Sequence, residues 1–108
     1  MPTIPREILI CQTDDGSEPF MDWLHGLDPV TQGRVRTRID RMSDGNLGDV
    51  APVGDGLSEL RLDVGPGYRV YFGQRGLEVH LIRGGSKRTQ VADIAAAKEF
   101  WRTHGDQD

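Results

Sequence analysis

Residues 59–85 read ELRLDVGPGYRVYFGQRGLEVHLIRGG, and this stretch decides the fold class. Apolar and polar side chains alternate in three runs, 59–64, 68–72 and 77–82. Alternation with a period of two predicts β-strands that have one apolar and one polar face. Gly65-Pro66-Gly67 and the segment 74–76 have the composition of tight turns. The stretch therefore predicts an antiparallel meander of three strands, which Gly84-Gly85 ends.

The residues before this stretch have the apolar spacing of a strand and two helices. Residues 7–12 are β-prone and predict a first strand. Ser17 is the expected N-cap of a helix whose apolar stripe has the spacing i, i+3, i+4, i+7. Asp28-Pro29 begins a second helix, which Gly45 ends. The short connection between the helices predicts an antiparallel helix hairpin. The expected inner faces are Phe20, Trp23, Leu24 and Leu27 in the first helix and Val35, Ile39 and Met42 in the second.

Two further segments complete the predicted order of elements. Residues 45–57 are rich in glycine and predict a long loop. Thr89 is the expected cap of a last helix, which Gly105 closes. The inner face predicted for this helix consists of Val91, Ile94, Ala95, Lys98 and Trp101. Helices and strands grouped in this way predict an α+β fold, with helices on one face of the sheet and polar side chains on the other.

Length and composition limit the class of protein. The chain has 108 residues, which predicts one domain over residues 1–108. We expect neither a membrane span nor a signal peptide, because no apolar run is long enough. The lone Cys11 predicts a small buried apolar side chain and no disulfide, and no Cys/His cluster suggests zinc. These features predict a cytoplasmic protein without a metal or another cofactor.

The charge distribution is uneven. The formal net charge is −4, which argues against a nucleic-acid partner. Residues 58–90, however, contain six basic and three acidic side chains, a balance of +3. A basic segment in an acidic chain is typical of a local phosphate site, although scattered surface charge gives the same count. A basic stripe on the second helix, Arg34, Arg38 and Arg41, is either a solvated face or a binding surface for RNA or an acidic partner segment.

The polar face of the meander holds candidate catalytic residues. With a simple register, Arg61, Arg69, Tyr71 and His80 point to the same side, and Lys87 lies just after the last strand. Cleavage of RNA without a metal needs a base, an acid and fixed cations that stabilise charge on the phosphate. Arginine and lysine supply the cations, a tyrosine stacks on a base or donates a proton, and a histidine titrates near neutral pH. The candidate RNA-binding residues are Arg61, Arg83 and Arg88. The alternative reading of these charges is the ordinary solvated face of a sheet.

A resemblance covers nearly the whole chain. The run Gly65-Pro66-Gly67-Tyr68-Arg69-Val70-Tyr71-Phe72, followed by residues 81–90 (LIRGGSKRTQ) and the pair Asp93-Ile94, resembles the phage-derived killer-protein, HigB-like branch of the RelE/ParE toxins. The resemblance implies a RelE-like toxin fold and no cofactor. It also implies an activity that cuts mRNA on the ribosome, with functional bases at Arg61, Arg69 and Lys87. The sequence differs from the RelE-like pattern at two points. The helix from residue 90 to 104 lacks the C-terminal tyrosine of RelE-like enzymes, and Glu59 occupies a position that is basic in them.

The resemblance also implies the partners. These are the ribosome and mRNA, together with a cognate antitoxin of the helix-turn-helix type that contacts DNA, so that the toxin meets DNA only through the complex. We predict a metal-independent endoribonuclease in which Tyr71, His80 or Glu59 supplies the missing acid or base. Two alternatives remain open. A ParE-like protein poisons DNA gyrase, and a lapsed toxin only binds its antitoxin.

Overall fold

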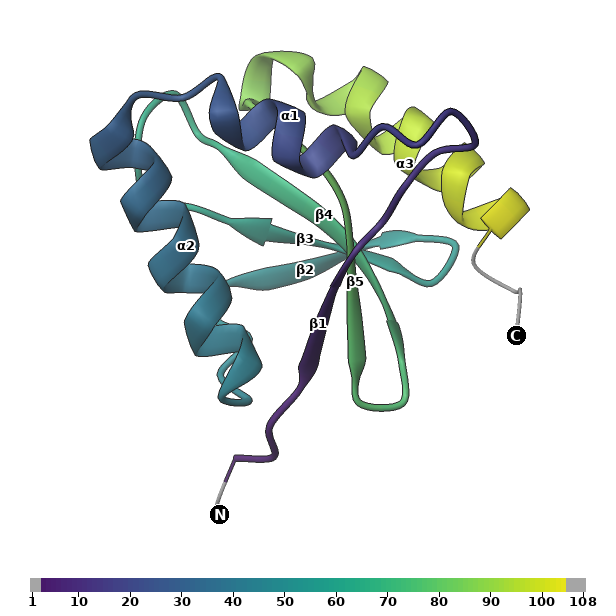
Figure 1. Ribbon diagram of the computed structural model, residues 1–108, viewed down its shortest axis with the longest axis horizontal. Helices are drawn as coiled ribbons and strands as arrows, with labels where there is room; N and C mark the ends of the chain where they lie inside the picture. The colour runs from purple at the N-terminus through teal and green to yellow at the C-terminus, as the bar shows by residue number, and fades with distance from the viewer. Residues whose placement is uncertain (1–2, 105–108) are drawn as a thin grey trace.

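The computed structural model describes residues 3–104, which form a mixed β-sheet flanked by α-helices (Figure 1). The strands are β1 (Glu7–Ile10), β2 (Val50–Gly54), β3 (Leu57–Arg61), β4 (Arg69–Arg75) and β5 (Glu78–Gly85). The helices are α1 (Pro19–His25), α2 (Pro29–Ser43) and α3 (Gln90–His104), and a 3-10 turn, η1 (Lys87–Thr89), leads into α3. The predicted α+β class is confirmed.

The sheet has the strand order β1-β5-β4-β3-β2. The strands β3, β4 and β5 pair antiparallel, which confirms the predicted meander. β1 lies at one edge and runs parallel to β5. β2 forms the other edge, so the prediction of a continuous loop over residues 45–57 is wrong. Pro52 explains the difference, because an edge strand tolerates a proline that the sequence pattern of a central strand would exclude.

The register contains one irregularity that matters for the site. Arg61 lies opposite Arg69, and Arg69 lies opposite Gly85. Between Tyr71 and Phe72 of β4 the pairing with β5 shifts by one residue. The bulge lets two successive residues of β5 contact α3. Ile82 packs in the core beneath α3, and Arg83 forms an ion pair with Asp93 of α3.

Both faces of the sheet are covered. α1 and α2 pack on one face and bury Phe20, Leu24, Val35 and Met42 against the apolar side of the meander. This confirms the predicted inner faces of the two helices. α3 packs on the opposite face, where a smaller core consists of Leu57, Tyr71, Ile82 and Ala97. The prediction of an uncovered polar face is therefore wrong.

α3 is rotated from its predicted orientation. Val91 is 86% exposed and Ala95 is also exposed, although both belonged to the predicted inner face. Asp93 and Ala97 are buried instead, with Ile94, Phe100 and Trp101 partly buried beside them. The rotation turns a polar residue, Asp93, toward the polar side chains of the sheet. The helix takes this orientation because Asp93 and Gln90 bind polar side chains of the sheet, Arg83 and Glu59, which would otherwise be solvated by water.

The helix ends follow the sequence in part. Asp28 is the N-cap of α2, because its carboxylate accepts a hydrogen bond from the Thr31 amide. Gly45, which follows the helix, has a φ of 97°, a value that favours glycine. α1 begins at Pro19 after Glu18, so Ser17 is not its cap. At the start of η1, Ser86 is the N-cap and forms a capping box with Thr89. Gly105 lies outside the described residues.

α1 and α2 are joined by a short connection, as predicted, but they do not form a close hairpin. α1 packs mainly on β5, and α2 reaches β1 (Figure 1). Each helix buries its apolar stripe against the sheet, and the sheet is the larger apolar surface. The sheet, more than the neighbouring helix, therefore fixes their directions.

Candidate functional site

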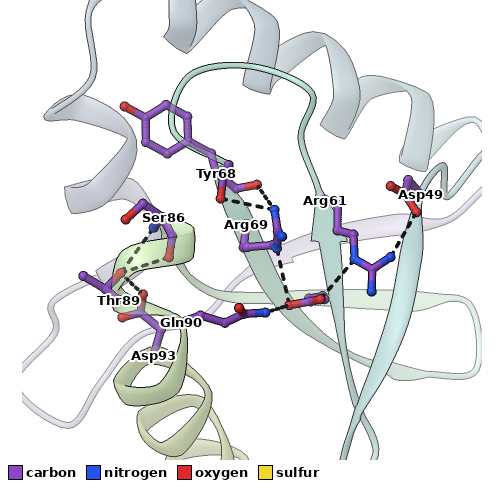
Figure 2. A network of polar contacts seen from close by, with 10 residues as sticks. Asp49, Arg61, Tyr68, Arg69, Ser86, Thr89, Gln90 and Asp93 are labelled. Carbon is purple, nitrogen blue, oxygen red and sulfur yellow. Dashed lines mark hydrogen bonds and ion pairs between the residues drawn. The ribbon is translucent and has the colours of Figure 1, made fainter.

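A polar cluster lies where β3 and β4 meet the start of α3 (Figure 2). At its centre is Glu59, a carboxylate that is only 4% exposed. Its Oε1 lies 3.2 Å from Nε of Arg61, and its Oε2 lies 3.7 Å from Nε of Arg69. Gln90 Nε2 donates a hydrogen bond of 2.8 Å to Oε2. Two guanidiniums and one amide thus compensate the buried charge.

A second buried carboxylate ties α3 to β5. Asp93 is 6% exposed, and its Oδ2 accepts a hydrogen bond of 2.5 Å from the Thr89 hydroxyl. Its Oδ1 lies 3.3 Å from Nη2 of Arg83. Arg83 is therefore engaged in holding the helix start, and it is not the free RNA-binding side chain that the sequence predicted.

Tyr71 is buried between these two ion pairs. The side chain is 0% exposed, and its hydroxyl has no hydrogen-bond partner among the described residues. Burial, and to a smaller extent the charges of Asp93 and Glu59, raise the pKa of Tyr71 to about 12 against the opposing effect of Arg69 and Arg83. Tyr71 lies on the predicted face of the sheet. The prediction that it is exposed there is wrong, because α3 covers it.

Three of the predicted cations, Arg61, Arg69 and Lys87, lie at one end of β3 and β4. Arg61 has a side chain that is 45% exposed, while that of Arg69 is 15% exposed. Lys87 and Arg88 are exposed on η1. A Cβ built on Gly67 would lie 3.2 Å from Cβ of Lys87 and 3.6 Å from Nη1 of Arg69, so both side chains lie beside the same turn. We refer to Arg61, Arg69 and Lys87 as the basic cluster.

Backbone contacts hold Arg69 within the cluster. Its Nη1 donates to the carbonyl oxygens of Gly67 at 3.2 Å and Tyr68 at 3.4 Å. Arg61 also pairs with Asp49, 3.8 Å away. Both guanidiniums are thus fixed before any ligand arrives, and such fixed donors suit the recognition of a phosphate.

His80 is not part of the basic cluster. It lies opposite Gly73, four residues along β4 from Arg69, which corresponds to about 13 Å. Its Nε2 lies 3.0 Å from Glu78, and its ring packs edge-on against Trp101 at 5.5 Å. The sequence prediction placed His80 on the correct face but could not show that it lies at the other end of that face.

The two glycines that end the meander allow close packing on opposite sides of β5. A Cβ on Gly84 would lie 2.1 Å from the Trp23 ring, on the α1 side. A Cβ on Gly85 would lie 1.8 Å from Oδ2 of Asp93, on the α3 side. The Gly-Gly pair is therefore a contact point for two helices.

Sequence reasoning missed the acidic half of the site. It offered Glu59 as a candidate acid or base and used Gln90 and Asp93 only as part of the family resemblance, so it did not predict that the two carboxylates are buried and paired with arginines. The signal was present in the last helix, where Gln90 and Asp93 are spaced by three and share a helix face. Two polar residues on the inner face of a helix indicate polar partners on the surface that it covers.

Within residues 3–104, no group of three His, Cys, Asp or Glu side chains is arranged to hold a metal ion. None of the described helices is both long and apolar enough to cross a membrane.

Comparison with known proteins identifies a relative. The chain is 46% identical over 81 residues to an uncharacterized protein of Haemophilus influenzae, and the match covers 73% of this chain and 82% of that protein. The two belong to one family. No family model and no solved structure matches the chain.

Proposed function

We propose that this protein is the toxin of a type II toxin–antitoxin pair, with a RelE-like fold, and that it cleaves mRNA on the ribosome. The observation that carries the proposal is the basic cluster. Arg61 and Arg69 lie opposite each other on the neighbouring strands β3 and β4, and Lys87 lies beside Arg69. The resemblance to the killer-protein branch of the RelE/ParE toxins includes these same three residues.

The geometry suits the stabilisation of a charged phosphate. Arg69 and Arg61 present guanidiniums that their partners fix in place, and Lys87 contributes an exposed ammonium group. In the proposed reaction these cations stabilise the negative charge that builds up on the scissile phosphate. Of the two candidate bases, Glu59 contacts both arginines and His80 contacts neither. We assign Glu59 the role of a positioning residue, because its oxygens are already occupied by Arg61, Arg69 and Gln90.

The low net charge is compatible with this reaction if the substrate is held by the ribosome. A protein of net charge −4 has little long-range attraction for free RNA. The ribosome presents the mRNA at high local concentration, so that a few local cations suffice. The proposal therefore includes the cytoplasm as the place of action and a helix-turn-helix antitoxin as the neutralising partner.

The test is induced expression in cells without antitoxin. Wild type is compared with Lys87→Ala, which removes an exposed side chain and leaves the core intact. Arg102→Ala is the matched control, since Arg102 is an exposed cation on α3 that pairs with Glu99. We expect wild type and the Arg102 variant to stop protein synthesis and to produce new mRNA 5′ ends within codons, and Lys87→Ala to do neither.

Two other results would replace the proposal. Arrested growth with intact mRNA and an induced DNA-damage response would indicate a gyrase poison. Normal growth with all three proteins would indicate a module that only binds a partner. Arg69→Ala is a poorer probe than the sequence suggested, because its side chain is largely buried and compensates Glu59.

A further inference from the structure

A basic groove lies on the other side of the sheet from the basic cluster. It is a hollow of about 540 Å³ between α2 and the segment that follows β3. Val30, Leu62 and Val64 supply apolar side chains, and Arg34, Arg38 and Arg41 line it along α2. Val30 is 68% exposed and Val64 is partly exposed, whereas Leu62 is only 3% exposed and forms the floor of the groove.

The three arginines of the groove are spaced i, i+4 and i+7. This spacing aligns them on one face of α2 over about 10 Å, or two helical turns. None of them forms an ion pair with a carboxylate of residues 3–104, and Asp63 is the only acidic residue that lines the groove. Arg38 is anchored by a bond from Nη2 to the Leu47 carbonyl, whereas Arg34 and Arg41 are exposed. The groove therefore has uncompensated positive charge beside an apolar surface.

A glycine inside α2 adds an independent observation. Gly33 lines the groove and is exposed, and a Cβ built on it would meet nothing within 4 Å. Nothing in the fold requires a glycine there, and glycine is a poor helix former. A glycine at such a place lets the backbone of another chain approach closely.

From these features we propose that the groove binds an acidic amphipathic helix of a protein partner. Apolar side chains of that helix would contact the exposed Val30 and the partly exposed Val64, and its carboxylates would pair with Arg34 and Arg41. Among the residues that line the groove none is aromatic, so it offers no surface on which RNA bases stack. The chemistry thus favours a peptide over RNA. This inference does not depend on the toxin activity, because the groove and the basic cluster share no residue.

The test uses a synthetic peptide and ¹⁵N-labelled full-length protein. The peptide is an amphipathic helix with leucines on one face and glutamates beside them, and a lysine-for-glutamate version and a single-stranded RNA oligonucleotide serve as comparison ligands. We expect the acidic peptide to shift amide signals of residues 30–41 and 62–64, with an affinity that falls as salt is raised.

Variants then locate the interaction. Arg34→Glu and Arg41→Glu should each weaken binding about tenfold, and Gly33→Leu should weaken it without a change of charge. Arg36→Glu is the matched control, because Arg36 is exposed on the same helix outside the groove. The proposal is overturned if the acidic peptide does not bind at millimolar concentration, if Arg34→Glu and Arg36→Glu bind it equally, or if the RNA is the tighter ligand at these amides.

Discussion

The two faces of the sheet are covered in different ways. The face under α1 and α2 buries a large apolar cluster, in which side chains such as Phe72 and Leu60 are 0% exposed. The face under α3 has a smaller apolar core and, next to it, two buried carboxylates, Glu59 and Asp93. Burial of apolar area stabilises the first face, whereas much of the second face is held by charge pairs whose desolvation offsets their attraction. The difference indicates that the first face carries the fold and the second is organised around the basic cluster.

The largest effect that we expect comes from the apolar face. Leu60→Ala removes a fully buried side chain from this face and should lower the free energy of unfolding by roughly 4–5 kcal/mol. Leu57→Ala makes the same change in the smaller core under α3 and should lower it by roughly 2–3 kcal/mol. Urea unfolding of both variants measures this difference. Equal losses would show that the two cores contribute alike.

Removing the central carboxylate should be the next largest change. Glu59→Ala leaves Arg69 largely buried without its ion pair, and we expect a loss of roughly 3 kcal/mol. The double variant Glu59→Leu with Arg69→Met removes both charges and should recover most of that stability. If the double variant is less stable than Glu59→Ala, the pair is a net stabilising contact and the contrast between the faces is smaller than we infer.

Substitutions of Gly84 and Gly85, which are adjacent in β5, perturb one face of the sheet each. Gly84→Ala forces the Trp23 ring aside, and Gly85→Ala forces Asp93 and Thr89 aside. Each should cost about 1–3 kcal/mol through overpacking. Only Gly85→Ala should also disturb the amide signals of residues 86–93, because only its contacts hold the start of α3. Similar spectra for both variants would contradict this division.

The central strands could be predicted from the sequence, and the covering of the second face could not. Alternation in residues 59–82 fixed which side chains share a face, and Asp28 and Gly45 marked the ends of α2. The same alternation cannot distinguish a polar sheet face that is exposed to water from one that is covered by polar residues of a helix. Here Glu59 of β3 lies under α3, on which Asp93 is also buried. Nor could the alternation place the bulge at Ile82 or the edge strand at Val50–Gly54, since both depend on pairing with residues distant in the chain.

Tyr71→Phe, unlike the substitutions above, should not lower the free energy of unfolding. It removes a buried hydroxyl that has no hydrogen-bond partner among the described residues, so stability should stay the same or rise by about 1 kcal/mol. Because Tyr71 has no exposed surface, toxicity should not change. This expectation reverses the sequence-based hypothesis that Tyr71 acts in catalysis, and a folded but harmless Tyr71→Phe protein would restore that hypothesis.

The smallest effect is a dependence on pH at the end of α3. His104 Nε2 lies 2.9 Å from Asp14, and this hydrogen bond raises the pKa of His104. Because the folded pKa is the higher one, the contribution is fully present below the ordinary value of about 6.5 and is lost as the pH rises through the folded pKa. Wild type should therefore lose slightly more stability than His104→Gln between pH 5.5 and pH 8.5, measured by urea unfolding in the same buffers. Parallel curves for the two proteins would show that the contact contributes nothing.

The most direct test of the central claim is a cleavage assay with purified components. Ribosomes programmed with a defined mRNA are incubated with wild type, Lys87→Ala or Arg102→Ala, and primer extension maps the 5′ ends of the RNA. Cuts at defined positions of ribosome-bound mRNA with wild type and Arg102→Ala, but not with Lys87→Ala, are the predicted result. Intact mRNA with the folded wild-type protein, or equal cleavage by the Lys87 variant, would contradict the assignment of the basic cluster as the active site.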